Sequence, residues 1–371
     1  MKATAERSDI LAALEKCAHV SGSASGRPHA GKVRIKAGHS DGAGILTFYA
    51  NDLSVSVDTV VLAVVDDEGM AATDTKRLHA VVLELPDGPI SLALTPKGAQ
   101  LSVSAKGHRK YALPTVDPDT FPAPPEPPED DPRVTLPAAR LAYLLSRVSH
   151  AMSLNDADQP HLQGVKLEVV DAVAFAVATD GKRFAKAETP VEGAEDMDTF
   201  VPRSMVRLIL AEYEKEELSV GQFGATIFVE TVDTLVCSQM PRSGFVPWRQ
   251  LLDSMQPETA ARVPRLPLLA SIKAVLAARS KGGDIILRYA EPYDALEIQL
   301  AKEDADAVDR VEVTDAEPRP FELAYEPRYI IDAAKAADVN MIFRVVQSGG
   351  LSALVIETDE KFFAWVAPRT V

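Results

Sequence analysis

Apolar residues recur along the chain at two spacings, one typical of helices and one of strands. Between Ser8 and Ala18 they fall at steps of three and four residues, which places them on one face of a helix. From Gly44 to Tyr49 apolar and polar residues alternate, which predicts a strand with one buried face. The order helix, strands, helix, strands then returns twice. It favours three similar α+β units over three unrelated domains.

Two helices are expected in each unit. Proline is compatible with a first helical turn, where its missing N–H has no partner in any case. In chain order, the six expected helices begin near Ser8, Thr75, Pro137, Pro202, Pro267 and Tyr329. The alternating runs between them predict antiparallel sheet, with hairpin turns at Glu291–Asp294 and Ser348–Gly350. Each unit is therefore expected to pack two helices on one face of antiparallel sheet.

Two proline-rich stretches divide the chain. The first, Phe121–Pro132, has no hydrophobic period, and its prolines oppose both helix and sheet, so we interpret it as a linker. The second, Pro257–Pro267, is a weaker boundary of the same kind. These boundaries predict domains at residues 1–124, 132–256 and 264–371.

The charge of the chain changes the picture of what it could bind. Its 371 residues include 39 basic and 54 acidic ones, a net charge of −15. An evenly spread negative charge opposes nucleic-acid binding, which depends on lysine and arginine. None of the three predicted domains has an excess of basic residues, so a DNA-facing surface requires charges sorted onto separate faces. No long apolar run or leader-like start is present, and a cytoplasmic location is expected.

The sequence contains no motif that indicates catalysis. Phosphate-binding loops, dinucleotide fingerprints, zinc-binding spacings and nucleophile elbows are missing. Cys17 and Cys237 lie in apolar stretches and are expected to be buried packing residues rather than a disulfide or metal site. Asp52 and Asp180 end strands, where acids usually shape turns. We expect no cofactor, no metal and no enzymatic activity, and a binding or scaffolding role is favoured.

One motif in the middle of the chain is more specific. The run Ala178-Thr179-Asp180-Gly181-Lys182-Arg183 follows a strand that begins near Phe175, and Gly164–Leu167 precedes it. These residues resemble the centre of the bacterial sliding clamp, the beta subunit of DNA polymerase III. The likeness extends in register along the whole chain through further segments: Ala50–Leu53, Leu113–Pro122, Phe200–Arg203, Ser238–Trp248, Phe321, Tyr329–Asp332 and Val366–Pro368.

The resemblance implies a ring that encircles duplex DNA and does no chemistry. Two chains would close head to tail as a homodimer of six similar units, with sheets outside and helices lining the hole. Such a ring gives processivity to DNA replication by tethering its partners. These would be the DNA polymerase III alpha subunit, the clamp loader and other proteins with clamp-binding motifs. The alternative is a clamp-fold paralogue that scaffolds protein partners without a housekeeping role in replication.

The resemblance also implies which residues face DNA. Weak attraction from cations on the inner helices suffices for a ring that slides. For any single cation, an ordinary solvated surface position is the favoured interpretation, whereas about half of the set is expected to face DNA. The expected helices also carry Lys16 and Arg328. The candidates are Arg27, Lys76, Arg77, Arg140, Arg147, Arg203, Arg207, Lys273, Arg279, Lys281 and Lys335.

Two protein-binding surfaces follow from the same resemblance. The dimer interface would join Tyr111 and Leu113, on an edge strand, to Val275 and Leu276, late in a helix of the third unit; packing within each unit is the alternative. A partner-peptide pocket would lie between the second and third units. Its candidate residues are Leu162, Thr179, Gly181, Lys182, Arg183, Phe184, Val246, Pro247, Gln250, Leu251, Trp365, Val366, Ala367, Pro368 and Arg369.

This pocket is where the chain departs most from the family pattern. Lys182 stands where histidine is usual, and Phe184 stands where leucine is usual. The end of the chain has Trp365 and Val366 in place of its usual methionine-rich sequence. Loss of methionine removes adaptable packing. Phe184 and Trp365 are expected either to refill the pocket with another shape or to be plain core residues.

Overall fold

The fold consists of antiparallel sheets with helices packed on them. The computed structural model describes residues 1–21, 29–95, 98–105, 109–128, 133–155, 157–211, 217–255, 257–278, 283–301, 307–337, 340–348, 351–358 and 361–369. Arg27, Arg279, Lys281 and the turn at residues 349–350, which the sequence analysis singled out, lie outside these ranges. None of the helices in the described ranges is long and apolar enough to cross a membrane.

Three repeats of one element order make up the chain. The first contains β1 (Lys2–Glu6), α1 (Arg7–Val20), β2 (Lys32–Ser40), β3 (Ala43–Asn51), β4 (Val55–Leu62), β5 (Val64–Asp67), β6 (Gly69–Asp74), α2 (Thr75–Leu83), β7 (Pro89–Leu94), β8 (Gln100–Ala105) and β9 (Lys110–Val116). The second contains β10 (Arg133–Pro137), α3 (Ala138–Val148), β11 (Gly164–Val170), β12 (Val173–Thr179), β13 (Arg183–Pro190), β14 (Met197–Pro202), α4 (Arg203–Ala211), β15 (Glu217–Phe223), β16 (Thr226–Glu230) and β17 (Thr234–Gln239). The third contains β18 (Pro257–Pro264), α6 (Arg265–Ala277), β19 (Ile285–Tyr289), β20 (Ala295–Leu300), β21 (Val308–Glu312), β22 (Phe321–Tyr325), α7 (Pro327–Ala336), β23 (Asn340–Ser348), β24 (Leu351–Glu357) and β25 (Phe362–Val366). The short helix α5 (Trp248–Asp253) stands between the second and third repeats.

Each repeat builds two groups of four neighbouring strands. One group has the order β4-β3-β2-β6 in the first repeat, β13-β12-β11-β14 in the second and β21-β20-β19-β22 in the third. The other has the order β1-β7-β8-β9, β10-β15-β16-β17 and β18-β23-β24-β25. Only β5 falls outside this scheme among the described strands, at the edge beyond β1. The predicted repeat of one plan three times over is thereby confirmed at the level of strand order.

Neighbouring repeats join through their sheets. The last strand of the second repeat, β17, pairs antiparallel with β4 of the first. The last strand of the third, β25, pairs antiparallel with β13 of the second. The chain divides into two compact units, residues 1–138 with 207–240, and residues 139–206 with 241–371. The middle repeat contributes to both units because one of its strand groups continues each neighbouring sheet.

All six predicted helices begin within two residues of the expected position. α3 begins at Ala138, directly after Pro137, and α6 begins at Arg265, so that Pro267 lies inside its first turn. The described part of the predicted linker, Phe121–Pro128, contains neither helix nor strand, as expected. A single helical turn, Pro118–Thr120, precedes it. The weaker boundary at Pro257–Pro267 was wrong as a connector, because it forms β18 and the start of α6. Pro257 and Pro264 stand at the ends of β18, where a missing N–H is tolerated.

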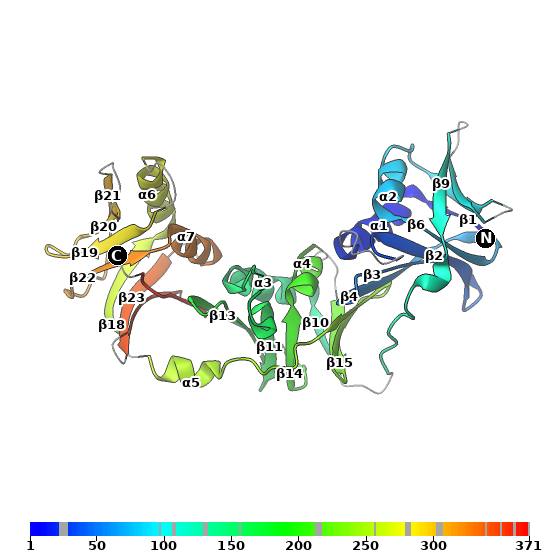
Figure 1. The fold of residues 1–371 in the computed structure, drawn as a ribbon. Helices are drawn as coiled ribbons and strands as arrows, with labels where there is room; N and C mark the ends of the chain where they lie inside the picture. The colour runs from blue at the N-terminus through cyan, green and yellow to red at the C-terminus, as the bar shows by residue number, and fades with distance from the viewer. Residues whose placement is uncertain are drawn as a thin grey trace. The chain divides into compact units, whose positions relative to one another are not determined.

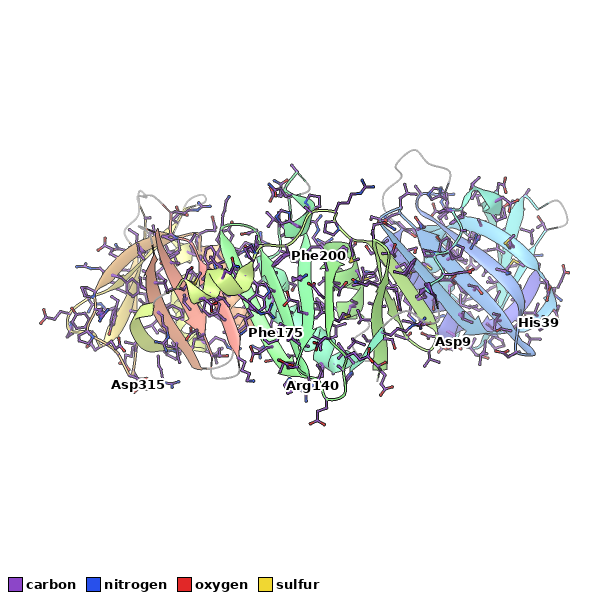
Figure 2. The ribbon with its side chains drawn as sticks, turned by 90° about the horizontal axis from the view of Figure 1, so that it is seen from below. Asp9, His39, Arg140, Phe175, Phe200 and Asp315 are labelled. Atoms are coloured by element: carbon purple, nitrogen blue, oxygen red, sulfur yellow. The ribbon has the colours of Figure 1, made fainter. Side chains whose placement is uncertain are left out.

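The core of the first repeat lies between its two helices and one sheet face. α1 and α2 contact each other and cover the strands β4-β3-β2-β6, as Figure 1 shows. The apolar face of α1 points at the sheet, and Ile10, Leu14 and Cys17 are fully buried. Polar residues of the same elements, such as Asp9 and His39, are exposed (Figure 2). The helical and strand periods of the sequence therefore predicted this core correctly.

One buried cation links the first two repeats. Lys16, on α1, is only 4% exposed, and its Nζ donates to Thr234 Oγ1 at 2.6 Å and lies 3.3 Å from Asp233 Oδ1. Thr234 Oγ1 also bonds the hydroxyl of Thr59 on β4, at 2.9 Å. Lys16 therefore cannot contribute to a DNA-facing surface, in contrast to the other helix cations considered with it. Its position is fixed by contacts more than 200 residues away in sequence, which no local pattern reveals.

Replacing this lysine tests the link. We expect Lys16→Met to lower the free energy of unfolding by about 2 kcal/mol, since it leaves a buried hydroxyl and a carboxylate without their charged donor. The matched control is Lys2→Met. Lys2 pairs with Asp66 at 2.9 Å, but both side chains are about half exposed, so a loss under about 1 kcal/mol is expected. Urea unfolding followed by circular dichroism measures both, and equal losses would contradict the assignment.

Candidate functional site

The family-like motif of the middle repeat forms a tight hairpin turn between β12 and β13. Asp180 Oδ1 accepts from the backbone N–H groups of Lys182 at 2.9 Å and Arg183 at 3.0 Å. Thr179 Oγ1 donates to the Arg183 carbonyl at 2.7 Å and accepts from Gly181 N–H. Gly181 adopts a φ of +83°, which glycine allows without strain. The prediction that Asp180 shapes a turn is confirmed, and each small or polar residue of the motif has a structural reason.

Arg183 connects this hairpin to helix α7. The arginine is 5% exposed, its Nε donates to Asp180 Oδ2 at 2.9 Å, and its Nη1 donates to Asp332 Oδ2 at 3.0 Å. The guanidinium also lies over the ring of Tyr329, 4.4 Å from its centroid. A planar fork with several donors suits such a site better than an ammonium group would. The motif arginine therefore fixes α7 of the third repeat against a hairpin of the second.

A loop before β11 forms the other wall of the site. Ser153 N–H donates to the Leu162 carbonyl at 2.8 Å, which closes the loop at its base. Inside the loop, Asp158 accepts from Ser153 Oγ and from Asn155 Nδ2. Gln163 Nε2 donates to the Asp158 carbonyl at 2.8 Å, and Arg203 Nη1 donates to the Ser153 carbonyl at 3.0 Å. Side-chain bonds of this kind hold a segment that has little regular secondary structure.

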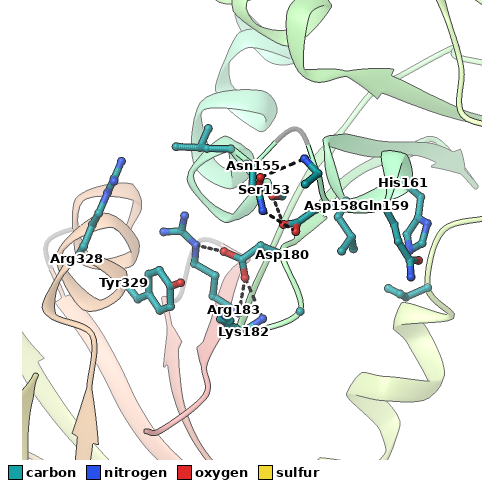
Figure 3. A pocket seen from close by; sticks show the side chains of 15 residues that line it. Ser153, Asn155, Asp158, Gln159, His161, Asp180, Lys182, Arg183, Arg328 and Tyr329 are labelled. Atoms are coloured by element: carbon teal, nitrogen blue, oxygen red, sulfur yellow. Dashed lines mark hydrogen bonds and ion pairs between the residues drawn. The ribbon is translucent and has the colours of Figure 1, made fainter.

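The loop, the hairpin turn and the start of α7 enclose a pocket of about 760 Å³. Figure 3 shows Arg328 and Tyr329 on one side, Asn155, Asp158, Gln159 and His161 on the other, and Asp180 to Arg183 between them. This volume is in the range of ligand-binding clefts, roughly 300–1,000 Å³. The lining residues are Ser153, Leu154, Asn155, Ala157, Asp158, Gln159, His161, Leu162, Asp180, Gly181, Lys182, Arg183, Val246, Arg328 and Tyr329.

An aromatic cluster packs behind the hairpin. Phe184 is fully buried and stacks with Trp365 of β25, their ring centroids 6.5 Å apart and their planes 8° from parallel. Trp248 of α5 is 5% exposed and joins the same cluster, as do Val246 and Leu251. Trp248 Nε1 donates to Glu168 Oε1 at 3.2 Å. Phe184 is therefore a core residue, and together with Trp365 it fills space behind the turn with rigid aromatic volume.

His150 lies beside the arginine bridge. Its Nδ1 is shielded from solvent and has no hydrogen-bond partner within the described residues. Burial of the ring, with the positive charge of Arg183 adding to it, lowers the pKa of His150 to about 4, against a smaller opposing effect of Asp332. The imidazole is therefore neutral in the folded chain at neutral pH.

Comparisons with known proteins were made by sequence and by structure. No protein-family model matches the chain. The beta sliding clamp of Synechocystis is 24% identical over 372 residues that cover 94% of each chain, and that of Caulobacter vibrioides is 26% identical over 355 residues, 90% of this chain and 89% of the relative. The beta sliding clamp of Chlamydia pneumoniae is 29% identical over 198 residues, 53% of each chain.

Solved structures agree with these relatives. A putative DNA polymerase III beta subunit from Eubacterium rectale has a TM-score of 0.89 at 17% identity and covers 100% of both chains. The DNA polymerase III beta subunit of Thermotoga maritima also has a TM-score of 0.89, at 21% identity, and covers 100% of this chain and 99% of its own. The chain is thus similar over nearly its whole length to bacterial sliding clamps, at low sequence identity. The clamp fold of three α+β units is confirmed.

The similarity to beta sliding clamps and DNA polymerase III beta subunits agrees with the prediction of a non-catalytic processivity subunit. In the described part of the chain, no three potential metal ligands are grouped together. Cys17 and Cys237 are both free and buried, as the sequence predicted. Burial raises the pKa of Cys17, and burial with nearby Asp58 raises that of Cys237 to about 12, so both thiols stay protonated.

The pocket between the loop, the hairpin turn and α7 includes part of the predicted partner-peptide set. Leu162, Gly181, Lys182, Arg183 and Val246 line it. Thr179, Phe184, Leu251 and Trp365 lie in the hairpin and the aromatic cluster around it. The remaining candidates do not line this pocket; they are Pro247, Gln250, Val366, Ala367, Pro368 and Arg369.

Three of these candidates, at the end of the chain, form contacts that place them outside the pocket. Val366 is 1% exposed and paired with Arg183 between strands, and Ala367 N–H donates to the Lys182 carbonyl at 2.9 Å. Arg369 turns toward Asp284 and Glu326, with its guanidinium nitrogens 2.9 Å from each carboxylate. The end of the chain thus supports the hairpin through backbone bonds.

Sequence reasoning missed the loop wall and the start of α7. The loop side chains come from Ser153, Asn155, Asp158, Gln159 and His161, and α7 supplies Arg328 and Tyr329. A signal for the loop was present, because serine, asparagine and aspartate at short spacings favour side-chain-closed turns. Nothing local indicates that this loop meets a helix about 170 residues later. Arg328, considered first as a cation of the inner helices, lies in the pocket instead.

The proposed DNA-facing residues differ in how freely they are exposed. Arg147 is half-buried and donates to the Ala336 carbonyl, and Arg203 is half-buried and bonds the Ser153 carbonyl. Arg140 is exposed and donates to Thr189 Oγ1 at 3.0 Å. The candidates that are exposed on helices, with no ion pair to a described residue, are Lys76, Arg77, Arg207, Lys273 and Lys335.

The proposed interface residues lie on β9 and α6. Tyr111 is 38% exposed and Leu113 is 9% exposed on β9, which pairs along its length with β8. On α6, Val275 is 2% exposed and packs within its own unit, whereas Leu276 is half-buried. α6 packs against β20 and β21. Tyr111 and Leu276 therefore retain the exposure that an interface requires, and Val275 does not.

The neutral His150 makes stability depend on pH. Its folded pKa of about 4 lies below the usual 6.5, so between these values the unfolded chain binds a proton that the folded chain does not. Stability from this group is present above pH 6.5 and is lost as pH falls toward 4, at up to about 1.4 kcal/mol per pH unit. Asp58 acts in the opposite direction, because burial raises its pKa to about 6.

A comparison of variants isolates the histidine. We expect the free energy of unfolding of His150→Phe to fall less than that of the parent chain between pH 6.5 and 4, with the contribution of Asp58 cancelling in the difference. His19→Phe, at an exposed site in the last turn of α1, serves as the control and should follow the parent. Urea titrations at a series of pH values measure this, and parallel curves for His150→Phe and the parent would contradict the assignment.

Proposed function

We propose that the chain is a DNA sliding clamp: a cytoplasmic homodimer that closes into a ring around duplex DNA and tethers replicative polymerase and other DNA-processing proteins. The partners would be the DNA polymerase III alpha subunit, the clamp loader and proteins with clamp-binding motifs. The predicted boundaries at residues 124, 132 and 256 are consistent with three such units, whereas the boundary at 264 leaves β18 outside the third. The observation that carries the ring is the way successive repeats continue one another's sheets.

The sheet continuation follows one rule. At both junctions inside the chain, the last strand of one repeat pairs with the end strand of a four-strand group in the preceding repeat. β17 pairs with β4, and β25 pairs with β13. The strand of the first repeat that corresponds to β17 and β25 is β9, and the strand of the third repeat that corresponds to β4 and β13 is β21. A second copy placed by the same rule would pair its β21 with β9. Open edges invite such pairing, and a ring of two chains removes both.

The backbone of β9 is oriented for this pairing. Thr115 N–H bonds the Ala99 carbonyl and Ala105 N–H bonds the Arg109 carbonyl, so alternate residues of β9 point their backbone groups at β8. Because antiparallel ladders alternate, Lys110 and Ala112 direct theirs away from β8. Pro114, which has no N–H, falls at another outward position. Only Thr115 and Val116 of β9 pair with β6 on that side.

β21 offers the matching edge. It pairs with β20 on one side, with Val313 N–H bonded to the Asp294 carbonyl and Leu300 N–H bonded to the Ala307 carbonyl. By the same alternation, Val308, Arg310 and Glu312 direct their backbone groups outward. Val308 is 56% exposed, an unusual state for valine on a free edge. The exposed carboxylates of Asp309 and Glu312 lie on opposite faces of β21, so one of them would share a face with Lys110 of the partner strand.

A proline tests the outward edge without breaking the inward one. We expect Ala112→Pro to remove an N–H that faces the partner and to shift the homodimer toward monomer, raising the dimer dissociation constant at least about tenfold. Ala112→Ser keeps the N–H and is the matched control. Sedimentation velocity measures the association state. A proline variant that dimerises as tightly as the serine variant would exclude β9 as the closing edge.

The attraction for DNA would come from exposed helix cations. Ring closure holds DNA topologically, so long-range, salt-screened attraction is sufficient and tight phosphate contacts are unnecessary. This reconciles a net charge of −15 with DNA binding, since only the helix faces need be basic. The cations in question are Lys76, Arg77, Arg207, Lys273 and Lys335.

Neutralising these cations should weaken DNA association in a salt-dependent way. Replacement of four of them by glutamine, Lys76, Arg77, Lys273 and Lys335, is expected to lower affinity for duplex DNA and to flatten its dependence on salt. Four exposed cations on strands and loops serve as the matched control: Lys36, Arg242, Arg288 and Lys361. Fluorescence anisotropy of labelled duplex over a salt series measures both sets. Equal effects of the two sets would contradict a DNA-facing role for the helices.

A second function is favoured by the altered pocket. Lys182, Phe184 and Trp365 depart from the usual clamp residues, and the last two form the stacked pair behind the turn. A clamp-fold paralogue that scaffolds other proteins would fit such a change. Primer extension on a circular template with clamp loader and polymerase separates the two. The replication clamp lengthens the products, whereas the scaffold leaves their length unchanged.

A further inference from the structure

Helix α1 differs from the other long helices in the charges that it exposes. The whole of α1 lies in the described part of the chain, and its exposed residues are Ser8, Asp9, Ala12, Glu15 and His19. None of these is a lysine or an arginine, since Lys16 is buried and bonded to Thr234. The helices α2, α3, α4, α6 and α7 each expose at least one lysine or arginine. At neutral pH α1 therefore exposes acidic residues where the other helices expose basic ones.

Two histidines lie beside Glu15. His79 of α2 places its Nε2 3.9 Å from Glu15 Oε1, so this pair bridges the contact between α1 and α2. His19 is exposed one turn further along α1, four residues after Glu15, and such residues are neighbours on a helix surface. Glu15 thus has a histidine beside it on each of the two helices, and all three side chains are at least partly open to solvent.

The strands under α1 and α2 contribute few groups that change charge near neutral pH. Lys32 pairs with Asp74, and Lys2 with Asp66, each at 2.9 Å. Burial raises the pKa of Asp58 to about 6, but Asp58 lies on the face of β4 opposite to its neighbour Thr59, which faces α1 through the bonds to Lys16. The titratable and charged residues of the strands packed against these helices are Lys2, Glu6, Lys32, Arg34, Lys36, His39, Asp58, Asp74 and Lys110.

We propose that Glu15, His19 and His79 form a pH-sensitive part of the surface that faces DNA. Histidine is the side chain that most readily changes its charge between pH 5 and 8. As the pH falls, protonated His79 neutralises Glu15 and protonated His19 adds a cation, so α1 changes from repelling phosphates to attracting them. The proposal rests on the proposed function in placing α1 and α2 beside DNA, and it adds control of that attraction by protons.

Duplex affinity at two pH values tests the two histidines. Fluorescence anisotropy of a labelled duplex is measured with the full chain over a salt series at pH 8 and at pH 6. We expect the affinity of the parent chain at low salt to rise about tenfold from pH 8 to pH 6, with a steeper dependence on salt at pH 6. The double variant His19→Gln with His79→Gln should reduce this rise to about twofold or less. The control double variant is His39→Gln with His161→Gln, which changes no α-helix and should keep the rise.

The carboxylate gives a second readout that does not depend on changing the pH. We expect Glu15→Gln to bind the duplex about threefold more tightly than the parent at pH 8, because a charge that repels phosphates is removed. Glu68→Gln is the matched control. Glu68 pairs with His39 at 2.8 Å, both side chains are exposed, and neither lies on a helix, so its loss should leave the affinity unchanged. Circular dichroism at both pH values checks that each variant is folded.

The outcomes distinguish this proposal from the proposed function. An equal rise in affinity for the parent and for the His19 and His79 double variant overturns the proposal. Glu15→Gln that binds no more tightly than Glu68→Gln at pH 8 also overturns it. A parent chain that binds the duplex equally at both pH values keeps the proposed function and loses the pH-sensitive surface. A parent chain that binds no duplex at either pH contradicts both.

Discussion

The structure depends on one constraint, that the unpaired backbone groups at the edge of a sheet need hydrogen-bond partners. A strand with one unpaired side exposes N–H and C=O groups that favour pairing with another strand. Inside the chain this is resolved twice, where β17 covers β4 and β25 covers β13. The repetition leaves one strand of each kind, β9 and β21, at the ends of the series. In the proposed ring, a second copy satisfies both by the pairing already used within the chain.

The charged side chains fall into two groups, those that are paired within the structure and those that remain exposed. Inside the pocket, Asp158, Asp180 and Arg183 bond one another or neighbouring polar groups, so their charges hold the walls in place. Lys16 does the same between the first two repeats. The exposed helix cations proposed to face DNA form no ion pair with a described residue. Stabilising charges and proposed binding charges are thus different residues, which is how an acidic chain is proposed to attract DNA.

The sequence predicted what depends on local periodicity. The six helices, most strands, the turn at Asp180 and the burial of Cys17 follow from apolar spacing and turn chemistry. It misassigned what depends on distant contacts. β18 required its partner β23, the burial of Lys16 required Thr234, and the pocket required a loop at Ser153 to meet α7. The prolines of β18 suggested a connector, and the charge of Lys16 suggested an exposed residue. Both indications were wrong because contacts with residues far away in the sequence determine these structures.

The proposed ring closes around DNA and holds it topologically. To test this, the chain is loaded onto nicked circular DNA with a clamp loader, free protein is removed by gel filtration, and the circle is then cut once. We expect the protein to stay with the intact circle and to be lost after linearisation. Proteins bound at both ends of the linear DNA should restore its retention. Equal retention on circular and linear DNA, or no retention on the circle, would contradict it.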